Sequence, residues 1–130
     1  MGRDMTPAEA AQRLIFHTIP DEGSFLNMLR PYDSLRHDIL ADVLDALRAC
    51  VPEITADAVP RDLMSALWAI SHMGRSWALA PGGMLRRNHL ISADDQKTLD
   101  TFLERFDYAV YALLEGWSVD QAFWWDQGGR

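Results

Sequence analysis

The sequence predicts an all-α fold, a compact bundle of about four to five main helices around a central apolar helix at about residues 60–79. A short further helix is expected at the C-terminus. Two observations predict this class. Apolar residues recur three and four positions apart through several segments, and capping and stop residues bracket those segments. The 130-residue chain is expected to form a single domain over residues 1–130, with 1–5 and 127–130 frayed.

The first helix is predicted over residues 7–17. Thr6 is a suitable N-cap, a proline occupies the first helical position, and Glu9 completes a capping box with Thr6. The Pro-Asp-Glu-Gly stretch at residues 20–23 then breaks the chain. A serine starts a short helical turn over residues 24–30, whose apolar side chains are expected to pack as a lid.

The next helix is predicted over residues 34–50, with Asp33 as its N-cap. Its apolar row consists of Leu35, Ile39, Val43 and Leu47. Asp38, Asp42 and Asp45 follow at i, i+4 and i+7, so they form an acidic stripe along one side of the helix. A solvated helix face explains such a stripe, and the alternative is a surface that meets a positively charged partner.

Residues 60–79 form the predicted central helix, which is apolar over most of its circumference and therefore belongs inside a bundle. On a helical wheel, one face collects Leu63, Leu67, Ile70, Gly74 and Trp77. Gly74 lies in the middle of that face, where its missing side chain would let another helix approach closely. The opposite arc contains Trp68, His72 and Arg75, together with two serines. Either Trp68 covers a neighbouring helix, or this arc lines a pocket.

A loop with two adjacent glycines, residues 80–83, stops the central helix, and the basic island of the chain surrounds it. The cations of this island are Arg75, Arg86 and Arg87. We expect them to pair with the protein's own acidic helices. The alternative is a bound phosphate, although the loop carries no nucleotide-binding fingerprint.

The longest helix is predicted to begin after Ser92, a suitable N-cap, and to end before Gly116. Its apolar residues give the clearest amphipathic pattern in the chain, and they include Leu99, Phe102, Leu103, Phe106, Val110, Leu113 and Leu114. Asp100, Glu104 and Asp107 repeat at i, i+4 and i+7 on the other side. They form a second predicted acidic stripe.

The short C-terminal helix is predicted to start at a capping box formed by Ser118 and Gln121. It carries Phe123, Trp124 and Trp125 in a row, and three consecutive side chains sweep about 200° of a helix surface. At least one ring is therefore expected near the surface. That ring either seals the edge of the bundle or anchors a partner, with Trp124 and Trp125 as the candidates.

The formal net charge of −7 argues against binding to nucleic acid, whose phosphates need cations. It is compatible with a protein partner that presents a basic surface. The single cysteine, Cys50, ends an apolar helical pattern, so we expect a reduced, buried thiol and a cytoplasmic location. The sequence shows no signal-peptide pattern and no apolar run that is long enough to span a membrane.

No group of residues has the spacing typical of catalysis or of a metal site. The histidines, His17, His37, His72 and His89, are far apart in the sequence, and neither an HExxH nor a CxxC motif is present. We therefore expect no enzymatic activity, no metal and no cofactor.

The sequence thus predicts a non-catalytic protein-binding module, in which acidic stripes speed encounter and aromatic side chains give affinity. In size, charge, helical content and lack of catalytic residues it resembles small bacterial immunity proteins, a resemblance of general properties that covers no motif. The resemblance implies an inhibitor that neutralises a toxin at its basic active site. The alternative is a helical small-molecule sensor or accessory subunit with a pocket beside Trp68, His72 and Arg75. Self-association into a homodimer would use the same surfaces.

Overall fold

The computed structural model describes residues 4–126, and this part of the chain has the predicted all-α fold. Its elements in chain order are α1 (Pro7–Phe16), α2 (Phe25–Leu29), α3 (His37–Ala49), α4 (Val51–Ile54), α5 (Arg61–Gly74), the π-helical turn η1 (Arg75–Leu79), α6 (Met84–Arg87), α7 (Ala93–Leu114), α8 (Val119–Ala122) and the 3-10 turn η2 (Trp124–Asp126). Between residues 4 and 126 no strand is present, and Leu29 and Tyr32 form an isolated β-bridge.

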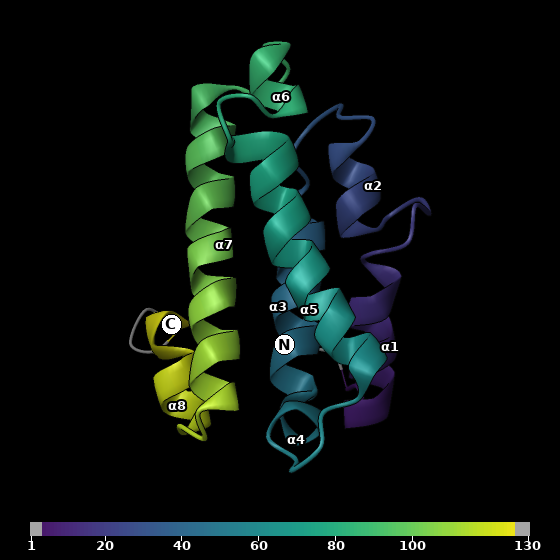
Figure 1. The fold of residues 1–130 in the computed structure, drawn as a ribbon, viewed down its shortest axis with the longest axis vertical. Helices are drawn as coiled ribbons and strands as arrows, with labels where there is room; N and C mark the ends of the chain where they lie inside the picture. The colour runs from purple at the N-terminus through teal and green to yellow at the C-terminus, as the bar shows by residue number, and fades with distance from the viewer. Residues whose placement is uncertain (1–3, 127–130) are drawn as a thin grey trace.

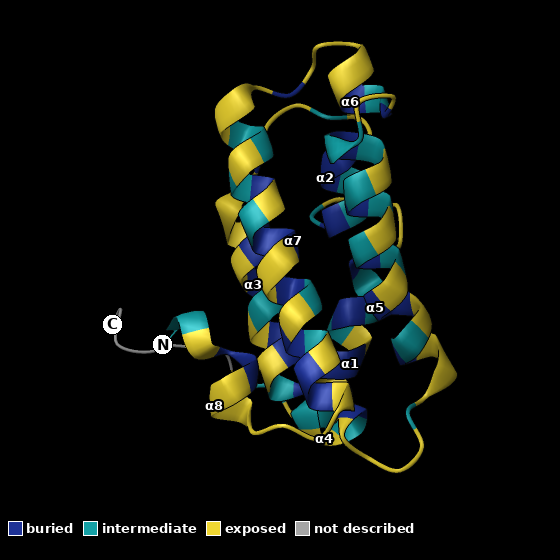
Figure 2. Ribbon diagram, turned by 60° about the vertical axis from the view of Figure 1, so that its left-hand side comes forward, coloured by how far each residue is buried: buried dark blue, intermediate teal, exposed yellow. Residues whose placement is uncertain are grey.

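The long helix α7 extends along the whole bundle, and α5 runs antiparallel to it in front of α3 (Figure 1). α5 contacts α1, α2 and α7, while α1 packs on α3 and η1 packs on α6 and α7. Each of the main helices turns a buried side inward and an exposed side outward (Figure 2). The core is therefore formed by amphipathic helices that meet along their apolar faces.

Four helices begin at side-chain caps that the sequence predicts. At α1, Thr6 Oγ1 accepts the Glu9 backbone N–H at 3.1 Å, and Glu9 Oε1 accepts the Thr6 backbone N–H at 2.9 Å. Ser24, Ser92 and Ser118 each accept the backbone N–H three residues further on, at 3.1 Å. Each such cap stabilises its helix by about 1 kcal/mol. These bonds explain where α1, α2, α7 and α8 start.

The predicted start of the third helix is wrong. α3 begins at His37, and its N-cap residue, Arg36, makes no side-chain cap bond, so Asp33 does not cap this helix. The Arg36 backbone N–H donates instead to Met28 Sδ at 3.2 Å, and the isolated β-bridge lies just upstream. Contacts with α2 therefore keep the chain extended until residue 37.

The predicted inner face of α5 is buried at Leu63, Leu67, Ile70 and Gly74, whereas Trp77, in the π turn that follows, is only half-buried. A Cβ atom on Gly74 would lie 3.0 Å from Leu103 Cδ1 and 3.3 Å from Phe25 Cζ. The expected close approach of another helix at this glycine is confirmed. The opposite arc of α5 is exposed, and Trp68 in its middle is 58% accessible. α5 is therefore an amphipathic helix with an exposed outer arc, and not the fully enclosed central helix that the sequence predicts; the long central helix of the bundle is α7.

The last part of the predicted central helix is the π turn η1. The Ala80 backbone N–H donates to the Arg75 carbonyl at 2.8 Å, five residues back. The loop then folds against this turn so closely that a Cβ atom on Gly83 would overlap the Ser76 carbonyl oxygen. Single π turns inside helices recur at functional sites. Here the turn places Arg75, Ser76 and Leu79 beside the exposed arc of α5.

Candidate functional site

The first predicted acidic stripe is interrupted in its middle, because Asp42 lies inside the protein. Its side chain is 5% exposed. Arg13 Nε donates to Asp42 Oδ2 at 2.7 Å, and His17 Nε2 lies 2.7 Å from the same oxygen. The prediction that Asp42 belongs to an acidic surface is therefore wrong. α1 packs on α3 and brings Arg13 and His17 against this carboxylate, which supplies the partners that a buried charge requires.

Both ring nitrogens of His17 are occupied. The Phe25 backbone N–H donates to Nδ1 at 3.0 Å, so Nε2 carries the ring proton and donates it to Asp42. Burial acts to raise the pKa of Asp42, but the hydrogen bonds from His17 and Arg13 outweigh it and hold that pKa below its usual value. With neither nitrogen open to a substrate proton, the pair ties α1, α2 and α3 together rather than acting as a catalytic base.

The outer aspartates of the first stripe, Asp38 and Asp45, are exposed. Asp38 is paired with Arg36 at 2.8 Å, and this hydrogen bond lowers the pKa of the Asp38 carboxyl. Asp45 lies two turns further along α3. With Asp42 internal, the two remaining aspartates are separate surface charges rather than a continuous stripe.

The second acidic stripe lies along α7, and an arginine from η1 joins two of its members. Arg75 Nη2 donates to Asp107 Oδ2 at 3.0 Å, and Nη1 donates to Asp100 Oδ1 at 3.4 Å. The predicted pairing of the basic island with an acidic helix is thus confirmed for Arg75, whereas Arg86 donates to the Leu79 carbonyl. Glu104 is exposed between the two aspartates. The stripe therefore remains at the surface, with its charge partly balanced by Arg75.

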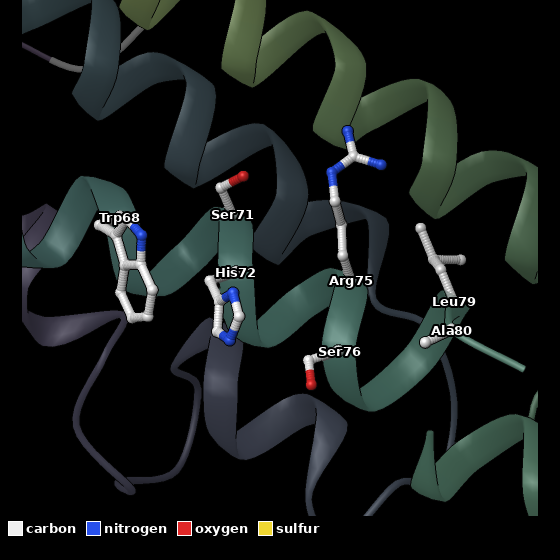
Figure 3. Close-up of a pocket in the computed structure, with 7 residues that line it drawn as sticks. All are labelled: Trp68, Ser71, His72, Arg75, Ser76, Leu79 and Ala80. Carbon is white, nitrogen blue, oxygen red and sulfur yellow. The ribbon is translucent and has the colours of Figure 1, made fainter. Parts of the chain in front are cut away.

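The structure brings Trp68, His72 and Arg75 to one outward surface (Figure 3). The Trp68 and His72 rings are stacked, with centroids 4.3 Å apart and planes inclined by 12°. The Arg75 side chain extends away from them toward α7 (Figure 3). These residues line a shallow depression of about 500 Å³, together with Ser71, Ser76, Leu79 and Ala80. None of these described lining residues is a carboxylate, so the depression offers imidazole, guanidinium and hydroxyl groups on an apolar base.

An apolar groove adjoins this depression where α5 and α7 lie side by side. We call it the α5–α7 groove. Its volume is about 260 Å³, and it is lined by Met64, Leu67, Trp68 and Ser71 of α5 and by Phe106, Asp107, Val110, Tyr111 and Leu114 of α7. Trp68, Tyr111 and Leu114 are 58%, 54% and 44% exposed. Because Trp68 and Ser71 line both hollows, the two form one continuous surface along the outside of α5.

Sequence reasoning found only the α5 half of this surface. Leu114 follows the amphipathic pattern of α7 and was expected in the core, yet it is 44% exposed. Tyr111 lies next to the apolar stripe and packs edge-to-face on Trp117, with ring centroids 5.6 Å apart. The one feature of the sequence that could have indicated the α7 half of the surface is Tyr111, an aromatic residue at the border of the apolar face near the C-terminal end of α7.

The C-terminal aromatic residues divide into buried and exposed rings. Phe123 is buried, and Trp125 packs against it with centroids 5.5 Å apart. Trp124 points outward and is 61% exposed, which confirms the expectation that at least one ring reaches the surface. Arg105 lies over the Trp125 ring at 5.8 Å from its centroid. Trp125 thus seals the edge of the bundle, and Trp124 is the ring that is open to a partner.

Cys50 is buried, and burial raises the pKa of its thiol to about 12, so the reactive thiolate is rare at neutral pH. Over residues 4–126, no three His, Cys, Asp or Glu side chains gather as metal ligands would. Among the helices described, none has both the length and the apolar character needed to cross a bilayer.

Comparison with known proteins gives no relative. The chain matches no protein-family model, and no curated protein and no solved structure is significantly similar to it.

Proposed function

We propose that the protein is a non-catalytic protein-binding module and that the α5–α7 groove is its recognition surface. The observation that carries the proposal is the exposure of Trp68, Tyr111 and Leu114 around one apolar floor. Contiguous apolar surface of this kind marks interaction sites on soluble proteins. The partner that fits is an amphipathic helix, because a groove between two packed helices accepts the apolar face of a third.

The two exposed rings supply most of the affinity in this proposal. A large aromatic side chain has about 150–250 Å² to bury, and burial yields about 25 cal/mol per Å². Covering the exposed half of Trp68 and of Tyr111 is thus worth about 2 kcal/mol each. The stacking of Trp68 on His72 holds its ring in place before binding, which lowers the entropy lost on association.

Charge determines which amphipathic helix fits. Asp107 lines the groove, and Asp100 and Glu104 precede it by seven and three residues on the same side of α7. Arg75 is the cation that pairs with Asp100 and Asp107. Together with the net charge of −7, this flank attracts basic residues beside the apolar face of the partner. If the basic residues of the partner belong to its functional surface, the bound module covers that surface and inhibits the partner. Neutralisation of a toxin is the specific form of this proposal that the resemblance to immunity proteins suggests.

The test compares two exposed aromatic surfaces. The wild-type protein is used to isolate its partner from the source cells, and the affinity of the purified partner is then measured for each variant. Trp68→Ser combined with Tyr111→Ser is expected to weaken the Kd about 1,000-fold, because the two rings together contribute about 4 kcal/mol. Trp124→Ser removes an equally exposed ring elsewhere and is expected to retain the affinity. Loss of binding in Trp124→Ser alone would place the interface at the C-terminal helix and contradict the proposal.

The electrostatic part is tested separately through the association rate. Glu104→Lys reverses a charge beside the groove, and Asp38→Lys makes the same change on α3. We expect the first substitution to slow association several-fold and to reduce its salt dependence, and the second to have a smaller effect. Equal effects of the two variants would mean that only the overall charge matters.

A small-molecule sensor is the second candidate, and the depression beside Trp68, His72 and Arg75 favours it. A planar anionic ligand would find an aromatic stack and two hydroxyl groups there, and it would compete with Asp100 and Asp107 for the Arg75 guanidinium. Such a ligand at about 100 times its Kd raises the unfolding free energy by about 2.7 kcal/mol. A ligand-dependent rise in Tm that His72→Ala abolishes would support the sensor, whereas the binding module responds only to its protein partner.

A further inference from the structure

A third hollow lies on the other side of α7, between that helix and α3. We call it the α3–α7 groove. It has a volume of about 390 Å³ and is lined by Leu40, Ala41 and Leu44 of α3 and by Lys97, Thr98, Thr101, Phe102 and Arg105 of α7. We propose that this groove binds a small amphiphilic anion, a molecule with an apolar body and a single carboxylate or sulfonate head.

The floor of the groove is suited to the apolar body. Leu40 and Phe102 are buried, and Leu44 is half-buried between them and the solvent. Ala41 leaves space on the α3 side because its side chain is short. The volume falls in the range of about 300–1,000 Å³ that small-molecule sites occupy.

The α7 wall is suited to the anionic head. Lys97 and Arg105 are eight residues apart, which separates them by about 12 Å along the helix and places one cation toward each end of the groove. A single head therefore pairs with one of the two cations at a time, and the groove offers such a partner at either end. Within residues 4–126 neither cation has an ion pair, and Arg105 lies over the Trp125 ring. Thr98 and Thr101 add hydroxyl donors between them.

The carboxylates of the surrounding elements stay outside the groove. Asp38 and Asp45 follow the outer side of α3, and Asp38 is held by Arg36. Asp94 is exposed one turn before Thr98, and Asp126 is paired with Arg48 at 2.7 Å. None of these four residues lines the groove. The protein has a net charge of −7, yet this wall presents two cations and, among the described residues that line it, no carboxylate.

The net charge also decides the class of ligand. An anionic polymer or membrane would contact a large part of the negatively charged surface and would be repelled. A small monoanion interacts mainly with the groups that line the groove, because salt largely screens charges that are more than about 8–10 Å away. A single-chain amphiphile in solution fits this balance.

The decisive experiment compares three probes of equal chain length, decanoate, decanol and decylammonium, by titration calorimetry with the intact protein. The overall charge of the protein attracts the cation most, so decylammonium would bind best if association were non-specific. We expect decanoate to bind at least about tenfold more tightly than either control and to shift the NMR signals of the Thr98 and Thr101 amides. Equal or tighter binding of decylammonium would overturn the proposal.

Charge-matched variants locate the site. Lys97→Glu with Arg105→Glu is expected to weaken decanoate binding at least about tenfold. Arg61→Glu with Arg87→Glu makes the same change in net charge at residues that do not line the groove, and it is expected to change the affinity less than about twofold. Equal loss in both variants would overturn the proposal. The circular dichroism spectrum shows whether each variant is folded.

Filling the groove is an independent test that removes no charge. Ala41→Trp should block decanoate, while Ala8→Trp, at an exposed position of α1, should not. Decanoate binding that survives in a folded Ala41→Trp protein would overturn the proposal. None of these substitutions touches the α5–α7 groove, so failure here leaves the proposed protein-binding function unaffected.

Discussion

At the scale of single residues, the most consequential feature is the buried group formed by Arg13, His17 and Asp42. Its two short hydrogen bonds meet at one carboxylate oxygen. The helical pattern places Asp42 at the border between the apolar face of α3 and the side that carries Asp38 and Asp45, so periodicity alone does not decide whether it is buried. Asp42 is buried because α1 packs on this side of α3, and the contact between the two helices arises only in the folded protein.

Asp42→Asn is expected to destabilise the protein by about 2–3 kcal/mol. The substitution removes the charge that compensates Arg13 and offers His17 a weaker acceptor, and breaking a buried pair is costly. Urea unfolding at pH 7 measures the change. Glu104→Gln, at an exposed position of α7, is the matched control and should stay within about 0.5 kcal/mol of wild type. Equal stability of the two variants would mean that the buried group contributes nothing.

The same carboxylate predicts a pH dependence. The folded-state pKa of Asp42 lies below the unfolded value, so the unfolded chain binds more protons in acid. The stability from this group is fully present above the unfolded pKa of about 4 and is lost as the pH falls through the folded pKa. Between about pH 5 and pH 3, the urea midpoint of wild type should fall more steeply than that of Asp42→Asn. Parallel curves would show that other carboxylates account for acid unfolding.

Cys50 provides a probe of the core. Because the thiol is buried and its pKa is about 12, we expect the native protein to react with a disulfide reagent at pH 8 only as fast as the core opens. In denaturant the single thiol should react at once. Rapid labelling of the native protein would indicate that the region between α3 and α4 opens readily.

At the scale of elements, helix starts marked by a local cap or a proline were predictable, whereas the start of α3, which has no side-chain cap, was not. Ser92 and Ser118 begin α7 and α8 as the sequence predicts, because a cap needs only residues within one turn. The start of α3 is set by the contact of Arg36 with Met28, and the π turn is set by the close approach of the following loop. Both depend on contacts with other segments, which helical periodicity does not reveal.

The π turn should therefore be sensitive to one glycine and not to its neighbour. A Cβ atom on Gly83 would meet the backbone carbonyl of Ser76, whereas a Cβ atom on Gly82 would meet nothing within 4 Å. We expect Gly83→Ala to cost about 1–3 kcal/mol, because backbone atoms cannot move aside easily, and Gly82→Ala to be neutral or slightly stabilising. Thermal unfolding of the two variants gives the comparison. Equal stability would show that the loop can move off the turn.

At the scale of the whole molecule, the candidate surface follows from how α5 and α7 are paired. The wheel of one helix predicts that Trp68, His72 and Arg75 share an arc, and the structure places them together. The partner half, with Tyr111 and Leu114, was not predictable, because the sequence does not specify which helices lie side by side. The acidic stripes were predictable as patterns, but their charge balance depends on Arg75 reaching across to α7.

If the α5–α7 groove is open to solvent in the free protein, the side chains at its rim should contribute little to the free energy of unfolding. Trp68→Ala and Tyr111→Ala are each expected to cost less than about 1 kcal/mol, because more than half of each side chain is already in water. Phe106→Ala, in the buried floor of the same groove, should cost about 3–5 kcal/mol.

Unfolding at several protein concentrations provides the measurement. A homodimer that covered the groove would make the wild-type Tm rise with concentration and would make the rim residues as costly to remove as Phe106. A Tm independent of concentration, together with a tolerant rim and a sensitive floor, is the result that leaves the groove open to a different partner.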